Sequence, residues 1–424
     1  MAYRTIKGMS DIYGDEMRIW AYVEATMRSY FSARLYEEIR TPIVEYTELF
    51  TRSIGESSDI VSKEMYTFVD RGERSLTMRP EGTASVIRAI IENSLVAKRD
   101  PLKLFYMGPM FRAERPQKGR KRQFYQCGVE MVGDLTAIND AEVIRDAVQF
   151  VDEVGIPKDT LSVKINTLGC SECRTAFIET LKKYFKNDFD ALCEDCHFRY
   201  DKNVLRIFDC KNKDCRGIID KAPKVTDNVC PQCERDFAVV QEELTRFQVP
   251  FVVDKDIVRG LDYYTGVVFE LTSSALGAQD ALGAGGRYDN LMAECGGPKK
   301  SAVGFAFGME RMMMCLGNVI IPDMSLAKTV YVAYGDNEYA SDARDIAAQC
   351  ETNGIATYGD YEGRSLKSQM KRANKFGFRW MIILNVDEWK EGTVTIKDLA
   401  AEDDGQVIVA QETVAEKIEE LMGN

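Results

Sequence analysis

The segment from residue 104 to residue 131 constrains the fold of this chain more than any other feature. The apolar run Leu104–Phe111 predicts a strand, and the alternation from Gln123 to Met131 predicts a second strand. The loop between them is rich in Lys and Arg. This arrangement predicts a hairpin with a cationic tip, and therefore a sheet with antiparallel neighbours.

Period-two alternation along the returning strand places Phe124, Gln126, Gly128 and Glu130 on one face. That face carries an aromatic ring, an amide, a glycine without a side chain, and a carboxylate. Polar groups inside a sheet cost free energy unless something pairs with them. The face therefore predicts a site for a small polar ligand with an amine, beside a polyphosphate bound by the cationic loop. The alternative is an ordinary hairpin with a solvated tip.

Bulk properties limit the function classes. The chain has 424 residues, enough for two or three domains. Its net charge of −12 creates no general attraction for nucleic acid, so an RNA partner requires local basic patches. Two such patches are Lys118–Arg122 and a second series, which comprises Arg364, Lys367, Lys371, Arg372 and Lys375. The alternative for the second is a solvated helix face.

His197 is the only histidine, which argues against a histidine base and against His-rich metal sites. No apolar run reaches the roughly 18 to 20 residues of a membrane span. The N-terminus lacks the apolar core of a signal peptide. We therefore expect a cytoplasmic protein without a membrane partner.

Composition divides the chain into three parts. Residues 1–165 and 245–320 predict one α+β domain with a mixed or antiparallel sheet, because strands and helices do not alternate regularly there. Residues 166–244 form a Cys-rich insertion. Residues 327–424 predict a layered α/β domain after a linker around Pro322. Its expected strands are 329–333, 355–359, 380–384 and 393–397, and its expected helices are 339–352 and 365–376.

Three further segments hold candidate ligand groups. Glu81, in Arg79–Thr83, precedes an expected helix at 84–91 and would meet a cation or an amine, or else complement the helix dipole. The string Arg259–Tyr264 precedes a strand and offers a cation and paired tyrosine hydroxyls. Gly283–Tyr288 predicts a flexible turn with one cation.

Residues 302–311 predict a strand followed by a helix at 309–316. Gly304, Ala306 and Gly308 share one strand face and leave it nearly flat, which suits a purine ring. Arg311 then begins the helix, where it could reach a terminal phosphate. The alternative is close packing of a helix on the strand.

Together these segments resemble the signature motifs of class II aminoacyl-tRNA synthetases, and Arg259–Tyr264 is similar to the string of the histidyl family. The helix and strand ending near Pro42 look like the dimer-forming first motif, 111–130 like the second and 302–311 like the third. The resemblance implies a sheet of the six-stranded type with flanking helices and a C-terminal anticodon-binding domain. Ala113 departs from the family, which often has His there.

The resemblance also implies the reaction and the site. L-Histidine would react with ATP, accompanied by Mg²⁺, to give histidyl-adenylate, and histidine would pass to tRNA(His) on a homodimeric enzyme. Glu81, Thr83 and Gln126 would hold the ammonium group. Glu130 and Tyr264 would bind the imidazole, with Tyr263 in the same pocket. The remaining implied roles are adenine stacking for Phe124, adenine or ribose contact for Glu114, and phosphate stabilisation for Arg112, Arg259 and Arg311.

The residues fit this chemistry. A carboxylate is already ionised at neutral pH, so adenylate formation requires charge neutralisation and positioning rather than a general base. A single histidine in the chain is therefore no obstacle.

Eight cysteines of the insertion have metal-ligand spacing and predict one or two structural Cys₄ zinc sites. They are Cys170 and Cys173, Cys193 and Cys196, Cys210 and Cys215, and Cys230 and Cys233. Which of them pair stays open, and the alternative is a set of buried thiols. Because none lies in the expected pocket, we expect histidine activation to survive metal removal.

Two rival functions use the same scaffold. One is a catalytically inactive paralogue that serves as regulatory subunit of ATP phosphoribosyltransferase, and the other is a nucleic-acid-binding accessory protein. The paralogue usually lacks the C-terminal domain and several active-site arginines, whereas this chain keeps both. The accessory protein predicts loss of Glu81, Arg112 or Arg311, and all three are present.

Overall fold

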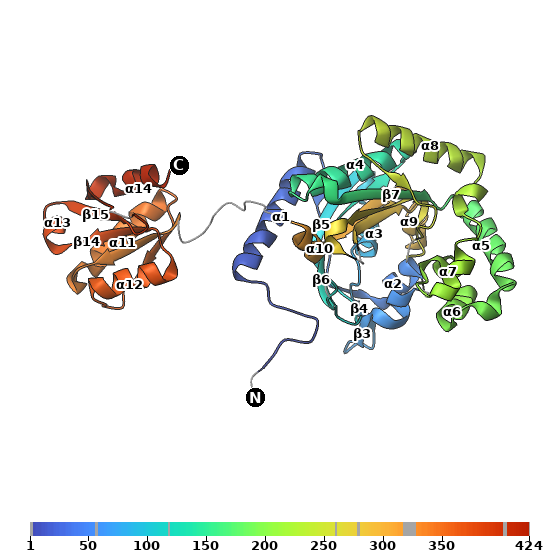
Figure 1. The fold of residues 1–424 in the computed structure, drawn as a ribbon, viewed down its shortest axis with the longest axis horizontal. Coiled ribbons are helices and arrows are strands. Elements are labelled where there is room, and N and C mark those ends of the chain that lie inside the picture. The colour runs from blue at the N-terminus through green and yellow to red at the C-terminus, as the bar shows by residue number, and fades with distance from the viewer. Residues whose placement is uncertain are drawn as a thin grey trace. The chain divides into compact units, whose positions relative to one another are not determined.

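The computed structural model describes residues 3–55, 58–117, 119–258, 261–277, 280–316, 328–401 and 405–423, with the backbone alone at Asp209 (Figure 1). The chain forms two compact units, Met1–Val319 and Ile320–Asn424, and each is described by itself. Among the described helices, none combines the length and the apolar character needed to cross a membrane.

An eight-stranded sheet forms the centre of the large unit, in the order β1-β5-β6-β11-β10-β9-β7-β8. The six inner strands pair antiparallel, whereas the two-residue strands at the edges pair parallel with their neighbours. The expected mixed sheet of the six-stranded type is confirmed, with one short strand added at each edge. The strands are β1 Glu37–Glu38, β5 Leu102–Phe111, β6 Gln123–Gly133, β7 Leu161–Thr167, β8 Val252–Val253, β9 Thr265–Ser273, β10 Ala281–Arg287 and β11 Ser301–Gly308.

The expected flexible turn at 283–288 is wrong, because most of it belongs to the inner strand β10. Its glycines serve packing. A Cβ at Gly283 would overlap the ring of Phe307, and one at Gly285 would overlap the ring of Phe269. Glycine here therefore makes room for aromatic rings of the neighbouring strands rather than for a turn.

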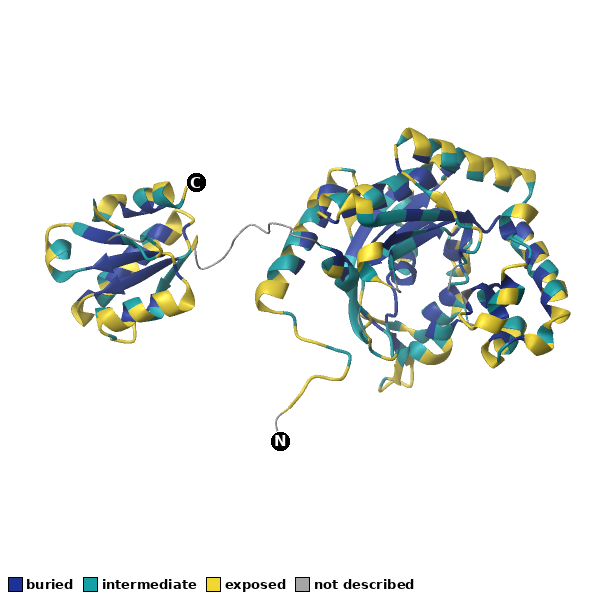
Figure 2. Cartoon of the chain, viewed as in Figure 1, coloured by how far each residue is buried: buried dark blue, intermediate teal, exposed yellow. Residues whose placement is uncertain are grey.

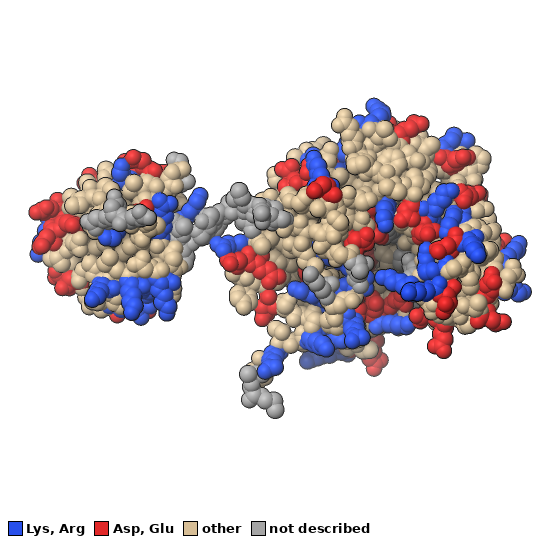
Figure 3. Space-filling view, in the orientation of Figure 1, with Lys and Arg blue, Asp and Glu red and all other residues tan. Residues whose placement is uncertain are grey.

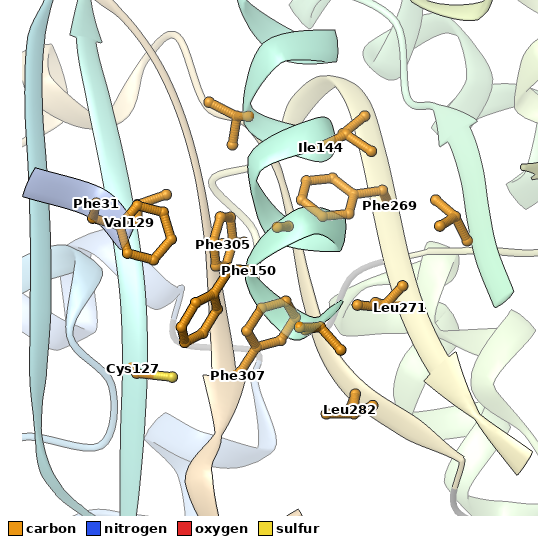
Figure 4. Packing of buried hydrophobic residues seen from close by; sticks show 14 of the residues in the cluster. Phe31, Cys127, Val129, Ile144, Phe150, Phe269, Leu271, Leu282, Phe305 and Phe307 are labelled. Atoms are coloured by element: carbon orange, nitrogen blue, oxygen red, sulfur yellow. The ribbon is translucent and has the colours of Figure 1, made fainter. Parts of the chain in front are cut away.

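One face of this sheet packs against α1 (Gly14–Ser32) and α4 (Ala137–Glu153). Figure 4 shows Ile144 and Phe150 of α4 facing the rings of Phe305, Phe307 and Phe269 on the strands. The amphipathic pattern of residues 16–37 predicts one helix, but α1 ends earlier, at residue 32. This face is apolar and fully buried, which leaves polar chemistry to the opposite face.

The opposite face is bordered by a small sheet and short helices. The small sheet contains β2 (Val44–Tyr46), β4 (Ser75–Met78) and β3 (Tyr66–Val69), in that order. The helix expected at 84–91 is present. The helical elements here are α2 Thr47–Ile54, a π-helical turn Ile60–Glu64, α3 Thr83–Glu92 and α9 Leu291–Glu294. Helix α10 (Met309–Cys315) follows β11 and packs instead in the core with α1 and α4.

The Cys-rich segment is helical. It contains α5 Ser171–Lys186, α6 Glu194–Lys202, α7 Lys213–Ile219 and α8 Pro231–Arg246. These helices follow β7 and return the chain to β8, and α8 lies beside α4 (Figure 1).

The C-terminal unit has a five-stranded sheet in the order β13-β12-β14-β15-β16. Its central strands are buried between helices (Figure 2). All six expected elements are present, whereas α13, β16 and α14 were not expected. The elements are β12 Val330–Tyr334, α11 Ala340–Thr352, β13 Thr357–Gly359, α12 Leu366–Phe376, β14 Trp380–Leu384, α13 Val386–Lys390, β15 Thr393–Asp398, β16 Gln406–Ala410 and α14 Val414–Met422.

Candidate active site

The alternation along β6 divides its side chains between the two faces of the large sheet. Cys127, Val129 and Met131 lie in the core with α1 and α4. Phe124 and Val132 pack on the other side, with α3 and the Cys-rich segment. The face that carries Gln126 and Glu130 therefore lies away from the apolar helices, as the alternation predicts.

A cavity of about 150 Å³ lies on that face. It is smaller than a pocket for a drug-sized ligand and suits a molecule of amino-acid size. Seven of the expected site residues line it together with the backbone of β10 and β11. They are Glu81, Thr83, Arg112, Gln126, Glu130, Tyr263 and Tyr264.

Glu130 forms the polar floor of the cavity and is almost completely buried. The hydroxyl of Thr83 donates to its Oε1 over 2.7 Å, and the hydroxyl of Tyr288 donates to its Oε2. Burial raises the pKa of the Glu130 carboxyl to about 8, although both hydrogen bonds favour the ionised form. An ionisable group with a strongly displaced pKa inside a cavity marks a candidate functional site.

Glu81 complements the N-terminus of α3, and it also lines the cavity. Its carboxylate accepts hydrogen bonds from the N–H groups of Thr83, over 2.6 Å, and Ala84, over 2.9 Å, at the N-terminus of α3. Burial raises the pKa of this carboxyl. The helix therefore orients a second buried acid toward the same space as Glu130.

Gln126 and Arg112 complete the polar wall. The amide oxygen of Gln126 is buried and has no hydrogen-bond partner among the described residues. A buried acceptor of this kind costs free energy until a donor reaches it. Arg112 is held by a hydrogen bond from its Nε to the carbonyl of Pro80, over 2.9 Å. The cavity thus offers two acids and an open acceptor on one side and a fixed cation on another.

Glycines keep the cavity open. A Cβ at Gly304 would overlap the carboxylate of Glu130, and a Cβ at Gly128 would approach the hydroxyl of Tyr106 and the carbonyl of Phe305. Gly304 and Ala306 line the cavity from β11, where the sequence predicts a flat face.

Of the described residues expected at the nucleotide, Arg112 lines the cavity, whereas Phe124, Glu114 and Arg311 do not. The Phe124 ring lies 5.1 Å from the guanidinium of Arg112. Glu114 pairs with Arg120 over 3.3 Å. Arg311 begins α10 as expected, and its guanidinium contacts the carbonyls of Ala281 and Gly119. Burial lowers the pKa of Arg311 and the charge of Arg120 lowers it further, whereas the charges of Glu114, Glu270 and Asp280 raise it.

Two expected residues have no described position. Arg259, expected at the α-phosphate, and Lys118 of the cationic loop lie outside the described residues. Two tyrosines near the cavity are not predicted from the sequence: Tyr288, whose hydroxyl donates to Glu130, and Tyr106, whose ring fills the space beside Gly82 and Gly128. Tyr288 ends the glycine-rich string, and recognising that string as a strand rather than a turn would have directed attention to it.

The eight cysteines of the Cys-rich segment form two groups. The first cysteine cluster comprises Cys170, Cys173, Cys230 and Cys233, and the second comprises Cys193, Cys196, Cys210 and Cys215. Within each cluster, all sulfur atoms lie within 4.8 Å of one another. The structure therefore joins the first Cys pair to the last and the two inner pairs to each other.

The sulfur geometry fits a tetrahedral metal. The Sγ atoms of Cys170 and Cys173 lie 3.6 Å apart, and those of Cys193 and Cys210 lie 3.8 Å apart. Zinc–sulfur bonds of about 2.3 Å in a tetrahedron place sulfurs about 3.8 Å apart. His197, which follows Cys196, places its Nε2 2.8 Å from the carbonyl of Phe189 and belongs to neither cysteine cluster.

A basic surface lies on the C-terminal unit. Figure 3 shows Lys and Arg side chains gathered over α12. Lys367, Lys371 and Lys375 are exposed there. Arg364 is less available, because it pairs with Asp360 over 2.8 Å, and Arg372 donates to the hydroxyl of Tyr358 over 3.0 Å.

Comparisons with known proteins agree along the whole chain. Residues 8–312 match the family described as histidyl-tRNA synthetase, and residues 329–421 match an anticodon binding domain. The chain is 44% identical to the histidine–tRNA ligase of Geobacter metallireducens, over 97% of this chain and 99% of that protein. It is 42% identical to the histidine–tRNA ligase of Natranaerobius thermophilus, over the full length of both.

Solved structures are similar as well. The apo histidyl-tRNA synthetase of S. aureus aligns with a TM-score of 0.82 and 30% identity, over 99% of this chain and all of that one. An ATP phosphoribosyltransferase regulatory subunit/histidyl-tRNA synthetase from Bacillus halodurans aligns with a TM-score of 0.66 at 22% identity, over 91% of this chain and 99% of that one. The second likeness concerns the fold alone.

Proposed function

Because the chain belongs to the histidyl-tRNA synthetase family, we propose that it activates L-histidine with ATP and transfers it to tRNA(His). The observation that carries this proposal is the 150 Å³ cavity, in which Glu130, Glu81 and Gln126 converge on a space of amino-acid size. A positive ligand group offsets the cost of two buried acids and of an unsatisfied amide oxygen.

Each side of histidine has a matching group in this cavity. The ammonium group lies against Glu81, Thr83 and Gln126. The imidazole lies between Glu130 and Tyr264, which pair with its two nitrogens. A site that pairs both ring nitrogens rejects apolar side chains of similar size by about 10⁴ or more, because they would leave its polar groups buried and unpaired.

Adenylate formation proceeds by positioning and charge stabilisation. The histidine carboxylate attacks the α-phosphorus of ATP, and pyrophosphate leaves. Arg112, fixed by its bond to Pro80, lies beside the reacting carboxylate, and Arg311 with Arg120 lies toward the outer phosphates. Arg259 is assigned to the α-phosphate by its place in the family string. Phe124 stacks on adenine, and Glu114 contacts adenine or its ribose. Mg²⁺ bound with ATP supplies further neutralisation of the phosphate charge.

ATP–pyrophosphate exchange, measured with each of the twenty amino acids in the absence of tRNA, tests this function. We expect exchange with L-histidine alone. Exchange with another amino acid, or none with any, would overturn the assignment. The absence of exchange would instead favour the regulatory paralogue, which the presence of Glu81, Glu130 and Arg112 in the cavity argues against.

The C-terminal unit is assigned to the anticodon stem of tRNA(His). Its sequence matches an anticodon binding domain, and the lysines of α12 offer charge to a phosphate backbone. A local patch is needed because the net charge of −12 gives no general attraction.

The enzyme acts as a homodimer through the region around Pro42 and the small sheet. Several large apolar side chains are exposed there, among them Tyr46 at 54%, Phe68 at 45% and Val69 at 67%. Clustered apolar exposure marks a surface for a partner. Val69→Glu should shift the mass in light scattering toward a monomer, whereas Val252→Glu, at an exposed position of β8, should not. A Val69→Glu dimer as tight as the wild type would refute this interface.

Both cysteine clusters hold zinc. All twelve cysteines are free thiols, and backbone N–H groups donate to the sulfurs, for example from Cys193 to Cys215 over 3.2 Å. Such donors favour the thiolate form that zinc requires. Elemental analysis of the purified protein should find about two zinc ions per chain. Less than about a tenth of an equivalent would leave the buried-thiol alternative in place.

A further inference from the structure

The first cysteine cluster lies next to the loop that carries Tyr264. The N–H of Leu168 donates to the carbonyl of Gly266 over 2.7 Å, and the N–H of Gly266 donates back to the carbonyl of Gly169 over 2.8 Å. Cys170 follows directly, and Gly266 comes two residues after Tyr264. The start of the first cysteine cluster therefore lies beside the C-terminal end of the Asp262–Tyr264 loop, which is called the histidine loop below.

The cluster closes across both ends of the Cys-rich segment. The N–H of Cys170 donates to Sγ of Cys233 over 3.2 Å, and the N–H of Cys230 donates to Sγ of Cys173 over 3.1 Å. Cys170 precedes α5 and Cys230 precedes α8. A metal among these four sulfurs would therefore hold the first turns of both helices against each other.

Arg174, the residue after Cys173, reaches from this turn to the histidine loop. Its Nη1 donates to the carbonyl of Asp262 and contacts the carbonyl of Tyr264 at 3.4 Å. Its Nη2 lies 3.7 Å from the Asp262 carboxylate. From the end of α6, the side chain of Asn203 donates to the same carboxylate over 2.5 Å. Arg174 and Asn203, both in the Cys-rich segment, thus form hydrogen bonds to the loop that ends in Tyr264.

We propose that zinc in the first cysteine cluster fixes the first turn of α5 so that Arg174 positions the Asp262–Tyr264 loop for histidine binding. Arg174 is a positioning residue, because it touches the loop's carbonyls rather than the cavity. This inference rests on the proposed histidine pocket and zinc occupancy. It also reverses the expectation from sequence that histidine activation survives metal removal.

The chain offers a matched control in Arg216. This residue follows Cys215 of the second cluster by one position, as Arg174 follows Cys173. It also donates to a carbonyl, that of Phe208 over 3.2 Å, and pairs with Asp220 over 2.6 Å. These partners lie outside the histidine loop, so Arg216→Ala removes a comparable set of bonds elsewhere.

The experiment compares Arg174→Ala, Arg174→Lys and Arg216→Ala with the full-length wild type. We expect Arg174→Ala to raise KM for histidine in pyrophosphate exchange at least about tenfold, the loss expected for a charge-assisted hydrogen bond. KM for ATP and the zinc content should stay within about twofold of the wild type. Arg174→Lys, which keeps the charge, should recover part of the histidine affinity, and Arg216→Ala should leave KM for histidine unchanged.

Direct binding tests the role of the metal. Cys170 and Cys233 line a cavity of about 320 Å³, which gives a chelator access to the first cluster. Calorimetry on chelator-treated protein should show weaker binding of histidine, restored by adding zinc. An unchanged KM for histidine in Arg174→Ala, or an equal loss in Arg216→Ala, would overturn the positioning role while leaving the synthetase function intact. Absence of exchange in the wild type would instead overturn the proposed function itself.

Discussion

Glu130 combines deep burial, two hydroxyl donors and a raised pKa at one side chain. An acid whose pKa rises on folding keeps its proton in the folded state over a pH range in which the unfolded chain has lost it. From about pH 4.5 upward, the unfolded state binds fewer protons, so the free energy of unfolding falls until the pH passes about 8. The apo protein therefore loses stability at Glu130 as the pH rises.

Glu130→Gln removes that loss, because the amide has the shape of the protonated acid and cannot ionise. At pH 8 the variant should be more stable than the wild type by up to a few kcal/mol, and near pH 5 the difference should nearly vanish. Thermal unfolding of both apo proteins at the two pH values measures this. The same variant should lose histidine-dependent exchange. An equal difference in Tm at both pH values would show that Glu130 does not titrate as described.

Gly304→Ala tests the space above Glu130. The added Cβ would overlap the Glu130 carboxylate and crowd the carbonyl of Val129. Because a displacement of about 1 Å in a site can cost about 10² in rate, we expect kcat/KM for histidine to fall on that order. The control is Gly217→Ala in α7, where no atom lies within 4 Å of the new Cβ. It should keep full activity and gain up to about 1 kcal/mol of helix stability. Equal activity of the two variants would contradict this account of Gly304.

At the scale of an element, helix α12 has a buried side that packs on the sheet and an exposed side that carries lysines. Gln369 and Ala373 are buried against the sheet, whereas Lys367, Lys371 and Lys375 are exposed. A spacing of four residues places the three lysines on one surface of the helix. The structure therefore supplies the continuous charge that an RNA backbone requires, over a single helix.

Replacing all three lysines of α12 with alanine should raise KM for tRNA and leave pyrophosphate exchange unchanged. The logarithm of the tRNA binding constant should also fall less steeply with the logarithm of the salt concentration. The slope should decrease in magnitude by about 0.7 to 0.9 for each phosphate that the lysines no longer neutralise. The single variants Lys371→Ala and Lys390→Ala form a matched pair, because Lys390 is exposed at the end of α13. A Lys390→Ala effect as large as that of Lys371→Ala would argue against a specific surface.

At the scale of the whole molecule, the two units have separate cores. The cores of the large unit involve α1, α4, α3 and the large sheet, whereas β12, β14 and their helices enclose those of the C-terminal unit. Every described residue that lines the 150 Å³ cavity belongs to the large unit. The proposed function therefore divides adenylate formation and tRNA recognition between the two units, and separate cores are what units that fold by themselves require.

A chain ending at residue 316 should retain histidine-dependent pyrophosphate exchange and lose most aminoacylation through a higher KM for tRNA. The reason is that the cavity remains complete without the C-terminal unit. The test compares the rates of pyrophosphate exchange and of aminoacylation between the truncated and the full-length chain. An unchanged KM for tRNA would refute the role of the C-terminal unit, and a loss of exchange in a folded truncated chain would refute the independence of the catalytic unit.

The sequence by itself determined what depends on local periodicity. Alternation placed Gln126 and Glu130 on one face of β6, and it predicted six elements of the C-terminal unit, because strand and helix periods are properties of the chain alone. The family string directed attention to Tyr264, which lines the cavity. Local pattern also allowed a turn at Gly283, since glycine is compatible with both a turn and a crowded strand.

Only the tertiary structure decided which distant residues meet. The pairing of the first and last Cys pairs, the bond from Tyr288 to Glu130 and the contact of Arg174 with the Asp262–Tyr264 loop all join residues far apart in sequence. Contacts of this kind depend on how strands are ordered and how helices return to them, and no spacing within a segment encodes that order. The pKa of Glu130 belongs to the same class, because burial by several elements sets it.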